Sequence, residues 1–152
     1  MWQIYAPEGA YGTADRKAFS EVITDVYADL CGLPRFYVVV VFEERPAGTI
    51  WVGGEPADNF VRVVIDHIAR QVDTPALRDL TMEMFEATME PFVKDRGFEW
   101  EIHIDETPIE FWRTQGFVPP PAESEHEKRW AADNAASEWQ GQDAHVWSDQ
   151  FA

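Results

Sequence analysis

Cysteine is nearly absent from this sequence, since Cys31 is the only one in 152 residues. A single thiol excludes an intramolecular disulfide and a cysteine-based metal knot, and we expect Cys31 to act as a small buried apolar residue. The chain also lacks an apolar run near the ~20 residues that a membrane-spanning helix needs, and its first residues do not form a basic and then apolar leader. These absences predict a cytoplasmic protein with no membrane partner.

Basic residues are also scarce. The chain has 12 Lys and Arg against 28 Asp and Glu, which gives a net charge of -16, and its basic residues form no run. Such a chain repels a phosphate backbone, so nucleic acid is excluded as a partner. Asp66 and His67 are neighbours on a predicted strand and point to opposite faces, so they cannot jointly hold a metal ion. We expect no metal and no cofactor.

Apolar and aromatic residues, by contrast, are plentiful. The hydrophobic share is 45%, which is enough for one sizeable core, and no change in composition marks a second complete domain. Aromatic residues make up 14% of the chain and include seven tryptophans. This exceeds what a monomer of this size needs inside, so we expect part of the ring surface to lie in a subunit contact.

The first third of the chain predicts a strand, a helix and a strand. Residues 2–6 are extended, and a helix begins at about Thr13, with an apolar stripe at positions spaced by three and four: Phe19, Val22, Ile23, Val26, Tyr27 and Leu30. Gly32 and Pro34 end this helix. The apolar run 36–42 predicts a strand covered on both faces. A turn at 45–48 and a short extended piece, 49–52, complete this unit.

The same order then repeats. Residues 60–68 predict a strand, Thr74 and Pro75 open a helix that Pro91 interrupts, and 98–105 alternate as a closing strand. The two units imply an α+β fold made of duplicated β-α-β units, about 1–54 and 55–121, with a four-stranded mixed sheet and two helices on one face. We expect a further subunit to cover the opposite face.

The last part of the chain differs in composition. Residues 107–116 predict a short helix that Pro108 opens and Gly116 ends, and a stiff run of prolines follows at 119–121. Residues 122–152 form an acidic tail that contains Trp130, Trp139 and Trp147. We expect one helix near 124–135, after which the chain frays. The domain is therefore predicted to end at about residue 121.

Several short stretches, in this order, match a known pattern: Tyr5-Ala6-Pro7-Glu8-Gly9, Ile23-Thr24-Asp25, Pro46-Ala47-Gly48, Ile50-Trp51-Val52-Gly53-Gly54, Phe60 to Arg70, Asp105-Glu106-Thr107-Pro108 and Pro119-Pro120-Pro121. Through them the chain resembles the cis-3-chloroacrylic acid dehalogenase group of the tautomerase superfamily, in its fungal-type branch. The resemblance covers about residues 2–130. It implies a duplicated β-α-β fold, a homotrimer and a small carboxylic acid as ligand.

The resemblance also implies where the site lies. The family's catalytic proline falls just before Met1, because the family's tryptophan aligns with Trp2, and this sequence opens with no proline at its start. The family's histidine, first arginine, tyrosine and glutamate correspond to Tyr27, His67, His103 and Thr114, of which His103 comes from a neighbouring subunit. Arg70 keeps the family's residue. The catalytic positions are thus Met1, Tyr27, His67, His103 and Thr114, and Arg70 and Trp2 are the substrate-binding positions.

Each of the polar positions has a plainer interpretation. Tyr27 continues the apolar face of its helix, so it fits core packing with its hydroxyl satisfied at a pocket edge. His103 lies among carboxylates and fits an ordinary solvated or interfacial imidazole. Arg70 is equally compatible with an ion pair to one of the 28 acidic residues.

These replacements predict little or no dehalogenase activity, because the water-activating carboxylate and the paired arginines are absent. An α-amine at Met1 has a pKa of about 7.7 to 8.0, so part of it is neutral at pH 7 and can act as a base. We therefore expect at most weak tautomerase activity on small enol or 2-oxo acids, supported by Met1 or His67. The alternative is a protein that binds a small carboxylate without turnover.

Overall fold

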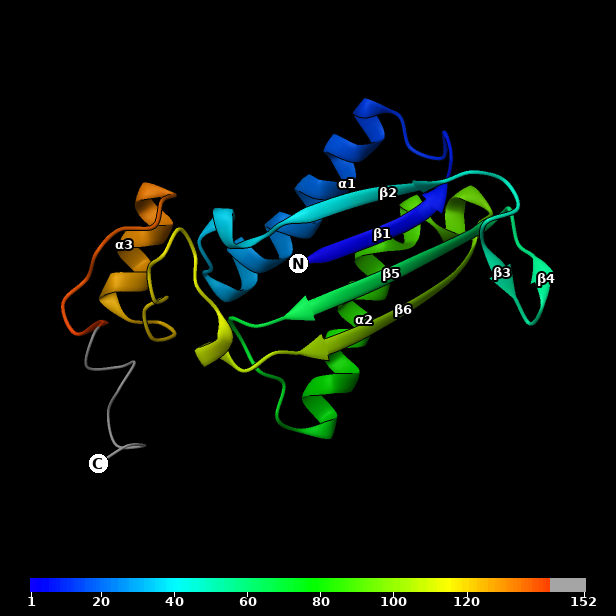
Figure 1. The fold of residues 1–152 in the computed structure, drawn as a ribbon. Coiled ribbons are helices and arrows are strands. Elements are labelled where there is room, and N and C mark those ends of the chain that lie inside the picture. Colours follow the sequence, from blue (N-terminus) through cyan, green and yellow to red (C-terminus); the bar gives the residue numbers. More distant parts are fainter. Residues whose placement is uncertain (143–152) are drawn as a thin grey trace.

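The computed structural model describes residues 1–142, and its centre is a four-stranded sheet (Figure 1). The strands are β1 (Trp2–Pro7), β2 (Val40–Arg45), β5 (Phe60–His67) and β6 (Glu99–Glu106), in the order β2-β1-β5-β6. Strands β1 and β2 are parallel, β5 and β6 are parallel, and β1 runs antiparallel to β5. The predicted mixed sheet of two β-α-β units is confirmed.

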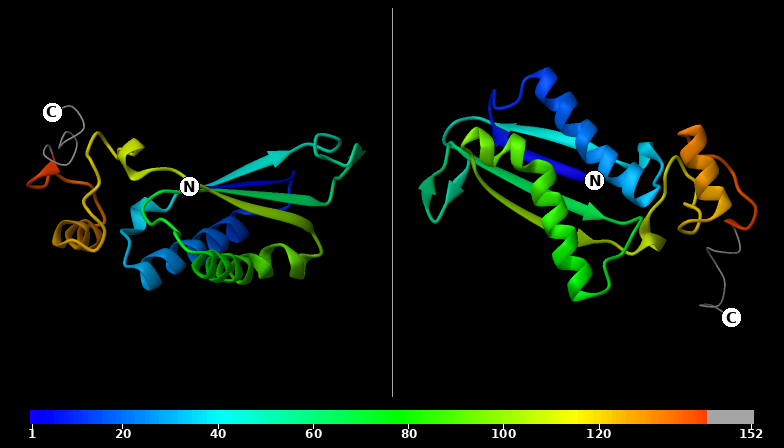
Figure 2. Two further views of the ribbon diagram at one scale, coloured as in Figure 1. Left: turned by 90° about the horizontal axis from the view of Figure 1, so that it is seen from below. Right: turned by 180° about the vertical axis from the view of Figure 1, so that it is seen from behind.

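Two helices cover one face of this sheet, as Figure 2 shows from below and from behind. Helix α1 (Thr13–Asp25) continues into a π-helical turn, Val26–Leu30, and α2 (Pro75–Met89) gives way to a 3₁₀ turn, Glu90–Phe92, at the predicted proline interruption. A second 3₁₀ turn, Lys94–Arg96, leads to β6. The largest fully buried side chains between sheet and helices are Trp2, Ile4, Phe19, Ile23, Val61, Val63, Ile65, Phe85 and Met89.

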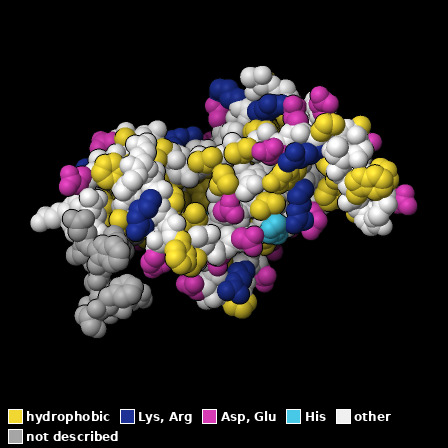
Figure 3. All heavy atoms as spheres, in the orientation of Figure 1, with side chains coloured by type: hydrophobic (Ala, Val, Ile, Leu, Met, Phe, Trp, Pro, Cys, Tyr) yellow, Lys and Arg dark blue, Asp and Glu magenta, His cyan; other side chains and the backbone are white. Residues whose placement is uncertain are grey.

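No helix of the described part of the chain covers the other face of the sheet, and Figure 3 shows this face as a mixture of charged and apolar side chains. Alternation along β5 and β6 puts Arg62, Glu101 and His103 on this face. Arg62 forms an ion pair with Glu101, and its Nη2 lies 2.7 Å from His103 Nδ1. The face therefore combines ion pairs with apolar surface.

The prediction of a strand at 36–42 is wrong for the first half of that range. Residues Arg35–Tyr37 form a 3₁₀ turn, and β2 begins only at Val40. The rings of Phe36 and Tyr37 pack against Trp130 near the C-terminus, at centroid distances of 6.0 and 6.2 Å, and this tertiary packing outweighs the local β propensity. Strand β2 lies at the edge of the sheet and is only partly buried in the single chain, so coverage of both its faces stays a prediction that depends on a neighbouring subunit.

The short helix predicted at 107–116 is reduced to one 3₁₀ turn, Ile109–Phe111. The chain then turns back on itself, because Gln115 and Gly116 adopt positive φ values of 52° and 85° and Thr114 pairs with Phe117. A left-handed pair of residues is incompatible with a continuing helix. The predicted extended piece near 49–52 is present as the small hairpin β3 (Trp51–Val52) and β4 (Glu55–Pro56).

The C-terminal part contains α3 (Glu125–Asp133), which Ser124 caps by accepting a hydrogen bond from the backbone of Glu127. The predicted fraying after about 135 is wrong for Trp139, which is buried and donates from Nε1 to the Val118 carbonyl at 2.8 Å. Trp147 lies outside the described residues. Among residues 1–142, no helix has the length and apolar character needed to cross a membrane.

Candidate active site

The start of β1 and the end of β5 meet at the same edge of the sheet, because the two strands are antiparallel neighbours. A cavity of ≈ 250 Å³ opens there. It is slightly smaller than the ~300–1,000 Å³ of pockets for drug-sized ligands, which suits a small molecule. Its lining is mostly apolar and comes from Met1, Trp2, Tyr27, Leu33, Tyr37, Val38, Val39, Asp66, His67, Ile68, Ala69, Arg70 and Trp112.

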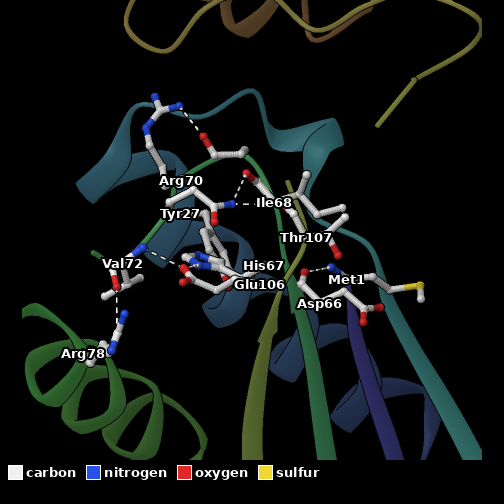
Figure 4. Close-up of polar contacts among 12 residues, drawn as sticks. Met1, Tyr27, Asp66, His67, Ile68, Arg70, Val72, Arg78, Glu106 and Thr107 are labelled. Carbon is white, nitrogen blue, oxygen red and sulfur yellow. Dashed lines mark hydrogen bonds and ion pairs between the residues drawn. The ribbon is translucent and has the colours of Figure 1, made fainter. Parts of the chain in front are cut away.

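The amine of Met1 is held at this cavity by the backbone of Asp66. It donates to the Asp66 carbonyl at 2.6 Å, and the Asp66 N–H donates to the Met1 carbonyl at 2.9 Å (Figure 4). These bonds continue the β1–β5 register by one residue. Burial lowers the pKa of the amine, and the nearby charge of Asp66 offsets part of this effect. The neutral, basic form of the amine is therefore more populated than in an exposed terminus.

Tyr27 and Trp2 meet at the wall of the cavity. Trp2 Nε1 donates to the Tyr27 hydroxyl oxygen at 3.1 Å, and both side chains are buried. Burial raises the pKa of Tyr27, so the hydroxyl keeps its proton. Because the oxygen accepts from Trp2, the hydroxyl hydrogen is available to a ligand. The packing interpretation of Tyr27 holds for its ring, and Tyr27 is also one of the residues that line the cavity.

His67 is the last residue of β5, and its ring packs against Tyr27 and Phe85. Its Nδ1 is buried without a hydrogen bond to any residue in 1–142, and it lies 3.7 Å from Glu106 Oε1, too far for one. That carboxylate oxygen instead accepts from the Val72 N–H at 2.6 Å. Burial lowers the pKa of His67 despite the opposing effect of Glu106, and the charge of the Met1 amine lowers it further. The imidazole is therefore neutral at pH 7.

Arg70 lines the cavity, but its guanidinium is bound to other groups of the protein. Its Nη1 and Nη2 bind the two carboxylate oxygens of Glu127 at 3.1 and 2.8 Å and the backbone carbonyls of Ala69 and Cys31 at 2.9 and 3.4 Å. Figure 4 shows its guanidinium pointing away from Met1. Arg70 thus forms the ion pair that its sequence context left open.

Two predicted site residues do not line this cavity within the described chain. His103 lies on the open face of the sheet beside Arg62, and its Nε2 is 3.3 Å from Asp105. Thr114 pairs its backbone with Phe117 in the tight turn. Since His103 is expected to act in a neighbouring subunit, its role stays a prediction, as does that of Thr114. Within residues 1–142, no three His, Cys, Asp or Glu side chains gather closely enough to hold a metal ion.

Three residues near the cavity were missed by the sequence analysis. Tyr37 was hidden in the apolar run taken for a strand, and Glu106 was indistinguishable from other strand-end carboxylates. Glu127 had one available signal, because it lies three residues after the cap Ser124 in a capping-box spacing. That spacing marks a helix start, however, and does not reveal the contact with Arg70.

Comparison with known proteins gives the chain its family. Residues 1–135 match the family described as "Putative oxalocrotonate tautomerase enzyme". RhCC from Rhodococcus jostii RHA1 is 51% identical over 91% of this chain and 99% of its own, with a TM-score of 0.89. A protein from Aspergillus fumigatus described as "a probable enzyme" is 34% identical over 91% and 96%, with a TM-score of 0.84.

A more distant structure shares the fold alone. It is N1, a member of the cis-3-chloroacrylic acid dehalogenase family, at 18% identity over 95% of this chain and 96% of its own, with a TM-score of 0.69. Comparison with curated protein sequences gave no match. The family match over residues 1–135 and the 51% identity to RhCC agree with the described fold. The chain therefore belongs to the matched family, within the tautomerase superfamily.

Proposed function

We propose that this protein is a tautomerase-superfamily member with weak activity at most on small enol or 2-oxo acids and little or no dehalogenase activity. One observation carries the proposal. The amine of Met1 lines the cavity with a lowered pKa, and Tyr27 and His67 line the same cavity. A neutral amine can act as a general base at pH 7.

The chemistry needs one proton carrier. The neutral amine of Met1 takes the proton from the enol hydroxyl, and the C–O bond becomes a carbonyl. The resulting ammonium then gives a proton to the other carbon of the C=C bond, whose electron pair forms the new C–H bond. The Tyr27 hydroxyl, with its free hydrogen, stabilises the oxygen on which negative charge develops. His67 is neutral and keeps the cavity wall uncharged next to the amine.

Dehalogenation asks for groups that this cavity does not bring together. Hydration of an alkene needs a carboxylate to activate water, and Thr114, which takes that position by resemblance, has none. It also asks for two arginines on the substrate carboxylate, whereas His67 stands at one of the two positions and Arg70 is bound to Glu127. The same two features account for the expected weakness of the tautomerase activity.

The test is to add one residue ahead of Met1. The strand register places this residue opposite His67 and beside Val38, both of which line the cavity. We expect the enol of phenylpyruvate to ketonise slowly with the parent and at least tenfold faster with an added proline, measured by loss of enol absorbance. An added alanine is the matched control, because it has the same length but a primary amine. Intact mass identifies the first residue of each protein.

Failure of both the parent and the proline variant to exceed the buffer rate would contradict the tautomerase proposal. In that case the second candidate function, binding of a small carboxylate without turnover, becomes the better one. The observation that favours it is that the cavity is lined by two potential cations, the Met1 amine and Arg70. Thermal stabilisation by small acids, with no spectral change over hours, supports this alternative.

We also propose that the protein assembles as a homotrimer. The sheet face opposite the helices is open, and Trp51 and Phe111 are 58% and 82% exposed in the single chain. A fused 4-OT structure that shares the fold at 18% identity is described as an asymmetric trimer. In a trimer, His103 of one subunit can face a neighbour. Sedimentation equilibrium tests this, and a monomeric mass contradicts it.

A further inference from the structure

The hydroxyl of Tyr37 is buried and has no hydrogen-bond partner among the described residues. Its ring lines the cavity and meets the edge of Trp112, with 4.6 Å between ring centroids. A buried hydroxyl without a partner is rare in folded proteins, because it has given up water without compensation. Its position at a cavity wall points to a ligand group that accepts its hydrogen.

Tyr37 and Arg70 line the same cavity, and the charges of Arg70 and Glu127 both act on the Tyr37 hydroxyl. Burial raises the pKa of Tyr37, the negative charge of Glu127 raises it further, and the positive charge of Arg70 lowers it. An anionic ligand at Tyr37 therefore meets one charge of each sign. The guanidinium of Arg70 is also separate from the amine, because Figure 4 shows it pointing away from Met1.

Glu127 and two backbone carbonyls together occupy both terminal nitrogens of Arg70. The carboxylate of Glu127 is only 4% exposed and also accepts from the Glu123 N–H at 2.7 Å. Each terminal nitrogen of Arg70 binds one oxygen of Glu127 and one backbone carbonyl. A ligand carboxylate must therefore displace Glu127 to form a bidentate pair with Arg70.

We propose that Tyr37 and Arg70 form a binding subsite of this cavity, separate from the Met1 amine, and that Glu127 sets the charge preference of this subsite by taking the place of a ligand carboxylate. This rests on the proposed function only in that the cavity binds small oxo compounds. Glu127 thereby weakens the binding of acids. The Tyr37 hydroxyl donates a hydrogen bond, so it binds neutral and acidic ligands alike.

The test compares the binding of an acid with the binding of its uncharged methyl ester. Binding of phenylpyruvate and of its methyl ester is measured by calorimetry on the parent and on Glu127→Gln. Glutamine keeps the size of the side chain and an oxygen for Arg70 but removes the charge. We expect phenylpyruvate to bind about tenfold more tightly to this variant, because the competing charge is gone, and the ester to change less than twofold.

Glu125→Gln is the matched control, because it removes the same charge from the same helix where the side chain is exposed and pairs only with Lys128. It should change neither affinity. Amide hydrogen exchange over Glu125–Asp133 reports whether α3 stays in place in each variant. An equal gain for acid and ester, or no gain for the acid with α3 in place, overturns the role of Glu127.

A second variant tests the subsite without touching α3. Tyr37→Phe removes only the unpartnered hydroxyl, so we expect both ligands to bind about fivefold more weakly, as loss of one neutral hydrogen bond predicts. Unchanged affinities overturn the role of Tyr37. Because only binding is measured, absence of ketonisation does not affect this result. Absence of binding to the parent and to both variants overturns the subsite, whatever the activity.

Discussion

The two ends of the cavity contrast in how their polar groups are used. At the amine end, Met1, Tyr27 and His67 are held by strand register and helix packing, and burial favours their uncharged forms. At the other end, Arg70 and Glu127 form an ion pair in which each satisfies the other. The comparison teaches that the end with less charge has more hydrogen-bonding capacity left for a ligand. The predictions below test this contrast.

Loss of the Glu127 carboxylate has the largest expected effect on stability. Glu127→Ala leaves the partly buried Arg70 without its partner and removes the acceptor for the Glu123 N–H. Removing one member of a buried pair typically costs ~3–5 kcal/mol, and we expect about 3 kcal/mol because Arg70 retains some solvent contact. Urea denaturation measures the change in the free energy of unfolding.

Glu125→Ala is the control for this experiment, since its carboxylate is exposed on the same helix. We expect no measurable change from it. A Glu127→Ala protein as stable as the parent would mean that water replaces the carboxylate, and the two ends of the cavity would then be alike in their freedom to bind a ligand.

The amine end should be less sensitive, because its key contact is neutral. Tyr27→Phe leaves Trp2 Nε1 buried without its acceptor, which should cost about 1–2 kcal/mol. Urea denaturation again provides the measurement, and ring packing against Phe85 is kept in the variant. An unchanged unfolding midpoint would show that Trp2 finds another acceptor.

The pH dependence of stability tests the neutral state of His67. Its folded pKa lies below the ordinary 6.5, so as the pH falls below 6.5 the unfolded chain binds a proton more readily than the folded protein. The free energy of unfolding should therefore fall between pH 7.5 and 5.5, and by less in His67→Gln. Equal falls in the two proteins, measured as urea midpoints, would mean that His67 is not held neutral.

The smallest expected effect on stability belongs to Tyr37→Phe. The variant loses a hydroxyl that has no hydrogen-bond partner in the described structure, so it should be as stable as the parent or slightly more stable. Tyr27→Phe and Tyr37→Phe remove the same atom from two residues that line the cavity. A clear loss of stability in Tyr37→Phe would reveal a partner and weaken the case for a ligand there.

The sheet and both helices could be predicted from sequence because their signals are local. The spacing of Phe19, Ile23 and Tyr27 and the alternation of 98–105 follow directly from helix and strand periodicity. The cap at Thr74 and the break at Pro91 lie where they were expected. The failures at 36–39 and 107–116 have another origin, since contacts with Trp130 and left-handed residues at 115–116 decide those segments.

The candidate site was predictable only in part. The family resemblance assigned five residues to one site, and all five line one cavity in the structure: Met1, Trp2, Tyr27, His67 and Arg70. The ion-pair partner of Arg70 was not predictable, because Glu127 lies 57 residues away in sequence and its capping-box spacing indicates only a helix start. The unpartnered hydroxyl of Tyr37 is likewise a property of packing and has no local signature.

The position of β1 inside the sheet has a practical consequence for handling the protein. Because β1 lies between β2 and β5, peptide fused ahead of Met1 must leave between Val38 and His67, through the mouth of the cavity. An affinity tag placed there would plug the very space whose ligands are sought. Purification tags therefore belong after Ala152. A ligand screen on protein with a tag ahead of Met1 would detect no binding, because the tag would already fill the cavity.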